Sequence, residues 1–253
     1  MTRKYASLGL ALILLLGLGI RLAGLYWGQG YSWFGQGDAL VAYSVAVDYG
    51  LGEPRAQYLG QPNYNGHSKL PGPLWTLFCF AGLRLFGSME WVVLGLILVN
   101  AATIYLTYLL VERTLGPPAS LWAALFTATL PFAVYYSVSI YNPNMMPFLG
   151  GLLFLALWEV IRRESVRSVF WLGFLLLAMP QFHMSVTMVL PALALILLLA
   201  APRLNWRWLL AGLLAGGLLY VPYLRAEFTT PDIPSFNMSV PASECLPNGV
   251  AEA

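Results

Sequence analysis

Residues 5–27 read YASLGLALILLLGLGIRLAGLYW and follow two basic residues, Arg3 and Lys4. The stretch is almost wholly apolar, and Arg21 is its one charged residue. A helix needs about 20 such residues to cross the hydrocarbon core of a bilayer. The stretch is too long for a signal peptide and has no small-residue cleavage site beyond Arg21, so it predicts a retained transmembrane helix. Because basic residues favour the cytoplasmic side, we expect a cytoplasmic N-terminus, with residue 28 onward outside.

The composition points to the same class. Of the 253 residues, 59% are hydrophobic and 9% are charged, and the mean hydropathy is +0.70. These values exclude a soluble globular protein and indicate a polytopic helical membrane protein. The chain has no basic tract, so nucleic acid is not an expected partner. Two cysteines, Cys79 and Cys245, make neither a disulfide framework nor a metal site.

Six further apolar segments follow, and the basic loops between them set their direction. One loop holds Arg162, Arg163 and Arg167, and a second holds Arg203 and Arg207, so both loops are predicted to be cytoplasmic. The segments are 72–87, 90–111, 119–139, 145–161, 169–201 and 207–224.

An even number of crossings must separate the N-terminus from the first basic loop, yet five candidate segments lie there. We predict that 72–87 does not cross, because it is short and carries Arg84 near its end; it would lie at the outer interface. The alternative segment that could fail to cross the membrane is 119–139, which Pro131 interrupts. That segment is longer, however, and an internal proline is tolerated where neighbouring helices cover it.

Residues 169–201 connect the two basic loops and must therefore cross twice or not at all. Pro180-Gln181-Phe182-His183 divides them, which places His183 near the outer surface. The sequence predicts an all-α polytopic membrane protein of about seven transmembrane helices, at 5–27, 90–111, 119–139, 145–161, 168–179, 184–201 and 207–224. Residues 1–224 form this transmembrane module, with juxtamembrane helices in a first outer loop at 28–70 and an extracytoplasmic tail at 225–253.

Charged residues gather in the first outer loop of a chain that has few of them. The loop holds Asp38, Asp48, Glu53, Arg55, His67 and Lys69. In the predicted topology this loop meets the turns at 141–144 and 181–183 and the outer end of the first helix. A carboxylate (Asp38), two cations (Arg21 and Lys69) and an imidazole (His183) would then share one pocket.

This set of groups suits a reaction with an anionic leaving group. A carboxylate such as Asp38 accepts the proton of an attacking hydroxyl, and Lys69 and Arg21 stabilise charge on a departing phosphate. His183 either donates to that phosphate or binds a divalent metal beside a carboxylate.

Each candidate also has a structural interpretation. Arg21 can anchor the helix at the interface by extending to water, and Asp38 can cap a juxtamembrane helix. Lys69 can mark the return to the membrane, and His183 can be a hydrogen-bonded polar residue in an apolar hairpin. Asp48 is as readily structural as a second acid. Asn144 can cap the helix that begins near Met145.

The order of these elements resembles a family of polytopic membrane glycosyltransferases that use polyprenyl-phosphate sugars. The family includes the protein O-mannosyltransferases and the lipid A aminoarabinose transferase. The similarity runs over about residues 5–224. It is carried by Arg21-Leu22, Asp38, Gly50–Pro54, Lys69–Leu74, Leu85–Gly87, the turn at 141–147 and the hairpin at 173–191.

The resemblance implies a GT-C-like transmembrane module, in which Asp38 is the base and Lys69 contacts the lipid phosphate. The chain departs from the family pattern at several acidic positions. Ala39 follows the base, Ser68 precedes the lysine, and Asn144 stands where some members have a second aspartate. These departures leave the use of a divalent metal open.

We therefore predict an inverting glycosyltransferase of the plasma (inner) membrane, which moves a sugar from a polyprenyl-phosphate donor to a hydroxyl acceptor on the extracytoplasmic face. Relatives carry further helices beyond the seventh, so an inactive fragment or an accessory lipid-binding subunit is the alternative. A small-molecule transporter is a third. It would need ionisable residues near the bilayer midplane, and the predicted spans hold almost none.

Overall fold

The computed structural model describes residues 3–27, 37–52, 71–162, 165–200 and 204–229, and within them every regular element is a helix. The all-α class predicted from the sequence is therefore confirmed. The α-helices are α1 (Arg3–Trp27), α3 (Gly37–Gly50), α5 (Leu74–Phe86), α6 (Glu90–Leu115), α7 (Pro117–Thr129), α8 (Pro131–Ser137), α9 (Met146–Arg162), α10 (Val166–Ala178), α11 (Leu190–Ala200), α12 (Trp206–Leu218) and α13 (Val221–Thr229). Three short 3₁₀ helices are η1 (Asn142–Met145), η2 (Met179–Gln181) and η3 (Met184–Val189).

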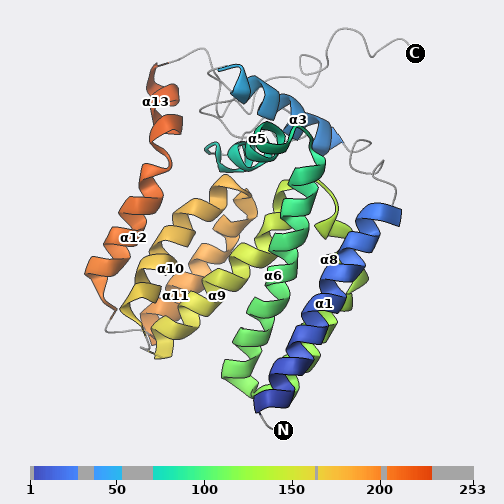
Figure 1. Cartoon of the computed structure of the whole chain (residues 1–253). Coiled ribbons are helices and arrows are strands. Elements are labelled where there is room, and N and C mark those ends of the chain that lie inside the picture. The colour runs from blue at the N-terminus through green and yellow to red at the C-terminus, as the bar shows by residue number, and fades with distance from the viewer. Residues whose placement is uncertain (1–2, 28–36, 53–70, 163–164, 201–203, 230–253) are drawn as a thin grey trace.

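The long helices run along one direction, and α3 and α5 lie across one end of them (Figure 1). The opposite end holds the start of α1, the end of α9 and the starts of α10 and α12 (Figure 1). The exposed residues Arg162, Arg167 and Arg207 therefore share an end with the N-terminus. This is the arrangement that the even number of crossings required.

Three helices in the described residues are long and apolar enough to cross a membrane: Tyr5–Tyr26, Glu90–Leu115 and Asn142–Arg162. The pair α7 and α8 makes a fourth if it is counted as one bent span. The other three predicted crossings, at 168–179, 184–201 and 207–224, fall on shorter helices. The total of seven crossings thus stays a prediction.

Two of the predicted boundaries need correction, and a proline explains each. The helix expected from residue 184 begins at Leu190, after the 3₁₀ turn η3, because Pro191 favours the first turn of a helix. The segment 207–224 is broken between α12 and α13. There Pro222 has no N–H to donate to the carbonyl four residues earlier.

Pro131 bends the fourth span rather than ending it. The axes of α7 and α8 differ by 55°, and Leu130 between them has an extended backbone with ψ of 117°. A proline removes one helical hydrogen bond and forces the chain out of the straight helix.

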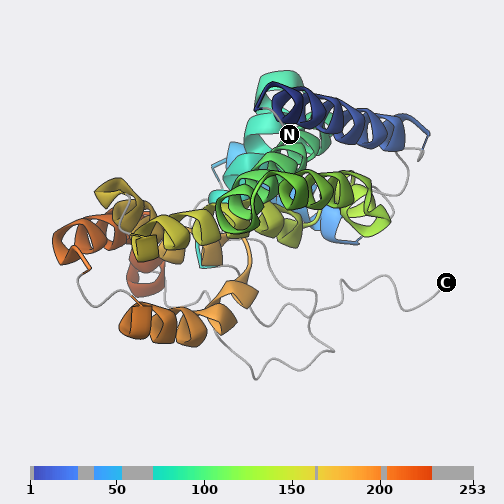
Figure 2. The ribbon, with the colours of Figure 1, turned by 90° about the horizontal axis from the view of Figure 1, so that it is seen from below.

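Viewed from the N-terminal end, α9 lies between the early helices α1, α6 and α7 and the late helices α10, α11 and α12 (Figure 2). The late helices form one apolar core with α9, and α3, α5 and α6 form another at the far end. The closest approach is between α10 and α12. A Cβ at Gly212 would lie 2.0 Å from the Phe170 carbonyl oxygen, so only glycine is compatible with this contact.

Candidate functional site

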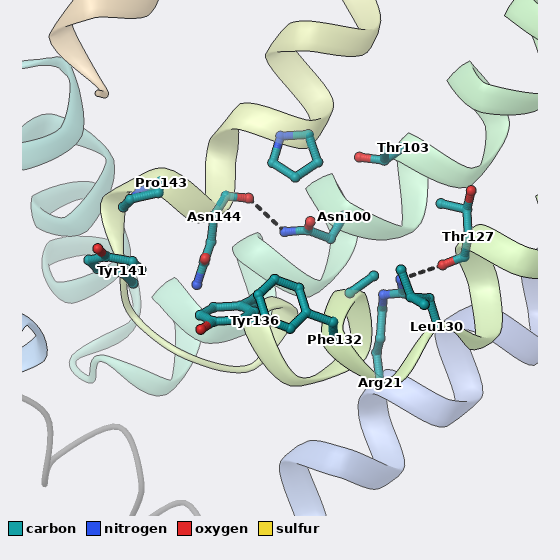
Figure 3. Close-up of a pocket in the computed structure, with 12 residues that line it drawn as sticks. Arg21, Asn100, Thr103, Thr127, Leu130, Phe132, Tyr136, Tyr141, Pro143 and Asn144 are labelled. Atoms are coloured by element: carbon teal, nitrogen blue, oxygen red, sulfur yellow. Dashed lines mark hydrogen bonds between the residues drawn. The ribbon is translucent and has the colours of Figure 1, made fainter. Parts of the chain in front are cut away.

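A cavity of about 500 Å³ opens between α1, α6, α8 and η1 (Figure 3). Its size is within the range of roughly 300–1,000 Å³ that is usual for small-molecule sites. Most of the cavity lining is apolar, and a few polar side chains lie among the apolar ones. The lining residues are Arg21, Asn100, Thr103, Thr127, Leu130, Phe132, Ala133, Tyr136, Tyr141, Pro143, Asn144 and Pro147.

Arg21 is the charged residue of this cavity, and its side chain is only 1% exposed. Nη1 donates to the carbonyl oxygens of Gly17 at 2.9 Å and Ala128 at 3.0 Å. Nη2 donates to the carbonyl oxygen of Thr127 at 3.2 Å. Nε has no hydrogen-bond partner. Three of the five N–H bonds of the guanidinium are therefore used by backbone carbonyls.

Two of the three carbonyls that Arg21 binds, those of Thr127 and Ala128, lie at the end of α7 that the bend at Pro131 leaves open. In a continuous helix the Thr127 oxygen would accept from residue 131, which here is a proline without an N–H. The last carbonyls of α7 also carry the negative end of its dipole, which favours a cation. Arg21 thus provides hydrogen-bond donors for the C-terminal carbonyls of α7, although it lies 106 residues away from Thr127 in the chain. In an apolar surrounding such carbonyls must be satisfied by protein groups.

Asn144 lines the same cavity and is also held by the backbone. Its Nδ2 donates to the carbonyl oxygen of Ser139 at 2.9 Å and to the Ser139 hydroxyl at 3.0 Å. Its own carbonyl oxygen accepts from Asn100 Nδ2 at 3.0 Å (Figure 3). An aspartate at this position lacks the N–H groups that Asn144 uses. The Asn144 amide therefore holds the backbone at Ser139, whereas Asn100 of α6 holds η1 through the Asn144 backbone carbonyl.

The two predicted turns meet at this end of the bundle. Asn142 in η1 donates through Nδ2 to the carbonyl oxygen of Phe182 at 2.8 Å. The next residue, His183, is partly exposed, and its Nδ1 accepts from the backbone N–H of Ser185 at 3.1 Å. Because Nδ1 acts as an acceptor, the proton of the neutral ring is on Nε2. Burial lowers the pKa of His183 below its ordinary value, which favours this neutral form.

The residues just after the predicted first outer loop reach the same turn. Gly72 packs so closely on Gln181 that a Cβ at position 72 would lie 2.3 Å from Gln181 Oε1. Gly72 also has a φ of +139°, a conformation that glycine adopts readily and other residues rarely do. The Gln181 side chain is fully buried. Three segments that are far apart in the chain therefore converge near residues 72, 142 and 181.

The remaining predicted site residues lie in the segment 28–70, which was predicted to be the first outer loop. Asp38 is the second residue of α3, but its side chain is outside the described residues, as is the whole of Lys69. Asp48 is exposed near the end of the same helix. Ala39, Ala42 and Ala46 face the other way and are buried in the core that α3 shares with α5 and α6.

Within the described residues, no three side chains of His, Cys, Asp or Glu lie close enough together to hold a metal ion. Cys79 is buried in α5, and burial raises the pKa of its thiol well above the ordinary value. It is therefore a packing residue rather than a metal-binding thiolate.

Comparison of the sequence with known protein families assigns the chain to one of them. A family model described as dolichyl-phosphate-mannose-protein mannosyltransferase matches residues 68–225, which is more than half of the chain. The chain belongs to this family. It is accordingly a membrane glycosyltransferase of the class that uses polyprenyl-phosphate sugars. Comparisons with curated proteins and with solved structures gave no match.

The matched segment of this glycosyltransferase includes Lys69, Asn144 and His183, while Arg21 and Asp38 precede it. The structure brings Arg21 and Asn144 to one cavity (Figure 3). His183 lies on the adjoining turn, next to Phe182, whose carbonyl oxygen accepts from Asn142. Asn100 and Thr103 were not among the site residues predicted from the sequence. Both are polar residues inside the long apolar helix α6, and that placement was the available signal.

Proposed function

We propose that this chain transfers a sugar from a polyprenyl phosphate to a hydroxyl group, at the extracytoplasmic face of the plasma membrane and with inversion at the anomeric carbon. The main support is that two contacts inside the family-matched segment meet at one end of the bundle, Gly72 with Gln181 and Asn142 with Phe182. Lys69 lies three positions before the first contact, and His183 directly follows the second.

In the proposed reaction, Asp38 accepts the proton of the acceptor hydroxyl as its oxygen forms a bond to the anomeric carbon. The bond from that carbon to the phosphate oxygen breaks on the opposite side, so the configuration inverts. The phosphate leaves with the bonding electron pair. Lys69 stabilises this negative charge, and the Nε2–H of His183 donates a hydrogen bond to it.

The cavity is proposed to hold the first isoprene units of the donor. Its lining is mainly apolar, and it lies beside η1, which contacts the His183 turn. Arg21 keeps Nε–H and one Nη2 hydrogen outside the hydrogen bonds that hold α7. These groups give the cavity a positive wall, so Arg21 would contribute to phosphate binding mainly through its charge.

The proposed orientation follows from the charges at the two ends. Arg162, Arg167 and Arg207 lie at the end that also holds the start of α1 (Figure 1). Basic residues near the ends of spans favour the cytoplasm. The N-terminus is therefore proposed to be cytoplasmic, and the site, with the residues from 225 onward, extracytoplasmic.

Replacement of Asp38 tests the proposal. In proteoliposomes supplied with polyprenyl-phosphate mannose and a membrane extract as acceptor source, Asp38→Asn should lower mannose transfer by about 10²-fold or more, because loss of a general base has effects of this size. Binding of the donor should stay near the wild-type level, because the amide has almost the same shape.

Asp48→Asn is the matched control, since it makes the same change on the exposed side of the same helix. It should transfer mannose at nearly the wild-type rate. Wild-type transfer by Asp38→Asn would exclude this aspartate from the mechanism. Donor binding without transfer by the wild-type chain would instead support an accessory lipid-binding subunit.

A further inference from the structure

A second cavity, of about 280 Å³, lies between α6 and α9 beside the cavity that Arg21 lines. Pro147 lines both cavities, so the two adjoin. Phe154 lines the second cavity and is 47% exposed, so this cavity opens on the outer surface of the bundle. Its lining is mainly apolar. Because α6 and the segment Asn142–Arg162 are each long and apolar enough to cross a membrane, the opening faces lipid.

One face of α6 runs through both cavities. Asn100 and Thr103 line the first cavity, and Thr107 and Leu110 line the second. Successive members of this set are three or four residues apart, the spacing that makes side chains neighbours on one side of a helix. At about 1.5 Å per residue, the stripe is about 15 Å long. The two cavities therefore lie end to end, and together they form what we call the α6–α9 groove.

Glycine forms the α9 side of this groove. Pro147, Gly150 and Gly151 line it at the same helical spacing. Gly151 has a packing reason, because a Cβ there would lie 3.1 Å from Leu106 Cδ1. A Cβ at Gly150 would meet nothing within 4 Å among the described residues. Since glycine inside a helix is destabilising relative to alanine, Gly150 keeps open a space that this part of the protein does not fill.

The groove runs in the direction that a lipid donor needs. α6 begins at the end of the bundle that holds α3 and α5 and ends beside the start of α1 (Figure 1). The groove therefore leads from the proposed site into the depth of the bilayer. A tail whose first units occupy the first cavity is tethered at the mouth of the groove, so its effective concentration there exceeds that of a free acyl chain.

We propose that the α6–α9 groove binds the isoprene units that follow the first ones, and thereby makes the enzyme prefer donors with a long polyprenyl tail. The inference rests on the proposed function for the place of the first units. Gly150 is then a residue that determines donor specificity, because its missing side chain leaves the room that the tail occupies. Lipid tails are as apolar as the groove, so close packing rather than the hydrophobic effect holds the bound tail.

A side chain at residue 150 tests the groove. Gly150→Leu fills it without a clash at Cβ, and leucine favours a helix more than glycine does, so the Tm should not fall. In proteoliposomes, with the donor given as its mole fraction in the bilayer, the KM for undecaprenyl-phosphate mannose should rise by roughly tenfold, because the displaced tail loses many dispersion contacts. The KM for geranyl-phosphate mannose, whose short tail ends within the first cavity, should keep its wild-type value.

Gly19→Leu is the matched control. A Cβ at Gly19 also meets nothing within 4 Å, but this glycine is on α1 and lines neither cavity. The variant makes the same change in equally open space, so it should change neither KM.

The second readout does not depend on turnover. Undecaprenyl phosphate that carries a diazirine just beyond its first isoprene units should label residues 103–110 and 147–154 of the wild-type chain on illumination. Gly150→Leu should lose most of this labelling. Phosphatidylglycerol with a diazirine on an acyl chain is the comparison probe, and it should label the exposed face of α1 at least as strongly as the groove.

The outcomes are distinct. An equal rise in the KM for both donors would overturn the proposal, since residue 150 would then act on the fold and not on the tail. Phosphatidylglycerol that labels the groove strongly and is not displaced by undecaprenyl phosphate would also overturn it, because the groove would then hold ordinary lipid. Failure of the proposed function would appear separately, as a wild-type chain that transfers mannose from neither donor, and the labelling would still decide whether the groove holds the tail.

Discussion

The link between Arg21 and the bend at Pro131 gives the sharpest prediction about the fold. The arginine donates to the carbonyl oxygens of Thr127 and Ala128 across the interface between α1 and α7. If its purpose is to satisfy carbonyls that the proline leaves open, its contribution to stability should depend on that proline. We therefore expect Arg21→Met and Pro131→Ala to be coupled.

The size of the effect follows from the two interhelical hydrogen bonds. Such bonds in membrane proteins average about 0.6 kcal/mol, with a maximum near 1.7 kcal/mol, so Arg21→Met should lower the free energy of unfolding by about 1–3 kcal/mol. In a Pro131→Ala background the alanine N–H can bind the Thr127 oxygen. The cost of Arg21→Met should then fall by about 1 kcal/mol.

The measurement is a double-mutant cycle, with the unfolding of all four proteins followed by denaturant titration in mixed micelles. Arg84→Met is the control for the loss of a cation, because Arg84 is exposed on α5, and it should change the stability by less than about 0.5 kcal/mol. Strict additivity of Arg21→Met and Pro131→Ala would refute the assignment of Arg21 as the group that completes α7.

Two further predictions concern packing and pH. Gly212→Ala should lower the Tm by several degrees, because its Cβ would lie 2.0 Å from the Phe170 carbonyl oxygen. Gly19→Ala is the control and should leave the Tm unchanged, because a Cβ there would meet nothing within 4 Å. Equal Tm values for the two variants would contradict the close contact of α10 with α12. For His183, the lowered pKa means that the unfolded chain takes up the proton first as the pH falls. Its contribution to stability is therefore complete above about pH 6.5 and is lost on acidification. His183→Gln should show a smaller drop in Tm between pH 7.5 and 5.5 than the wild type, and an identical drop would argue against a partly buried, neutral imidazole.

The parts of the fold that depend on local sequence were predictable. Residues 90–111 gave α6 almost to its boundaries because a long apolar run can only be a span. The sequence predicted that Pro131 interrupts the segment 119–139 without ending it as a span, and the structure shows this interruption as the 55° bend between α7 and α8. The common end of the basic loops followed from charge alone. The start of α11 was missed because hydrophobicity continues through 184–189, and the local effect of Pro191 decides the boundary.

The site was less accessible, because its contacts join residues that are far apart in the chain. No pattern in the sequence indicates that Arg21 binds carbonyls 106 and 107 residues away, or that Gly72 rests on Gln181. Asn144 was singled out as a position where relatives have an acid. The structure gives it a different task, since its amide holds the Ser139 backbone.

These contacts suggest why polar residues in this half of the bundle are a weak guide to catalysis on their own. The backbone is irregular here, at the α7–α8 bend and in the 3₁₀ turns η1 and η2. In an apolar medium every open backbone group needs a partner from the protein. Arg21, Asn100, Asn142 and Asn144 all donate to backbone carbonyls.

A polar side chain that already serves the backbone has less capacity left for a substrate. The groups that still have unused hydrogen-bond donors or acceptors are then the better candidates for binding substrate or for catalysis. In the described residues these groups include the Nε2 of His183 and the Nε–H of Arg21, and the proposed mechanism adds Asp38 and Lys69 from the predicted first outer loop. Variants of Asn144 should accordingly reduce stability before they reduce transfer, whereas variants of Asp38 should do the reverse.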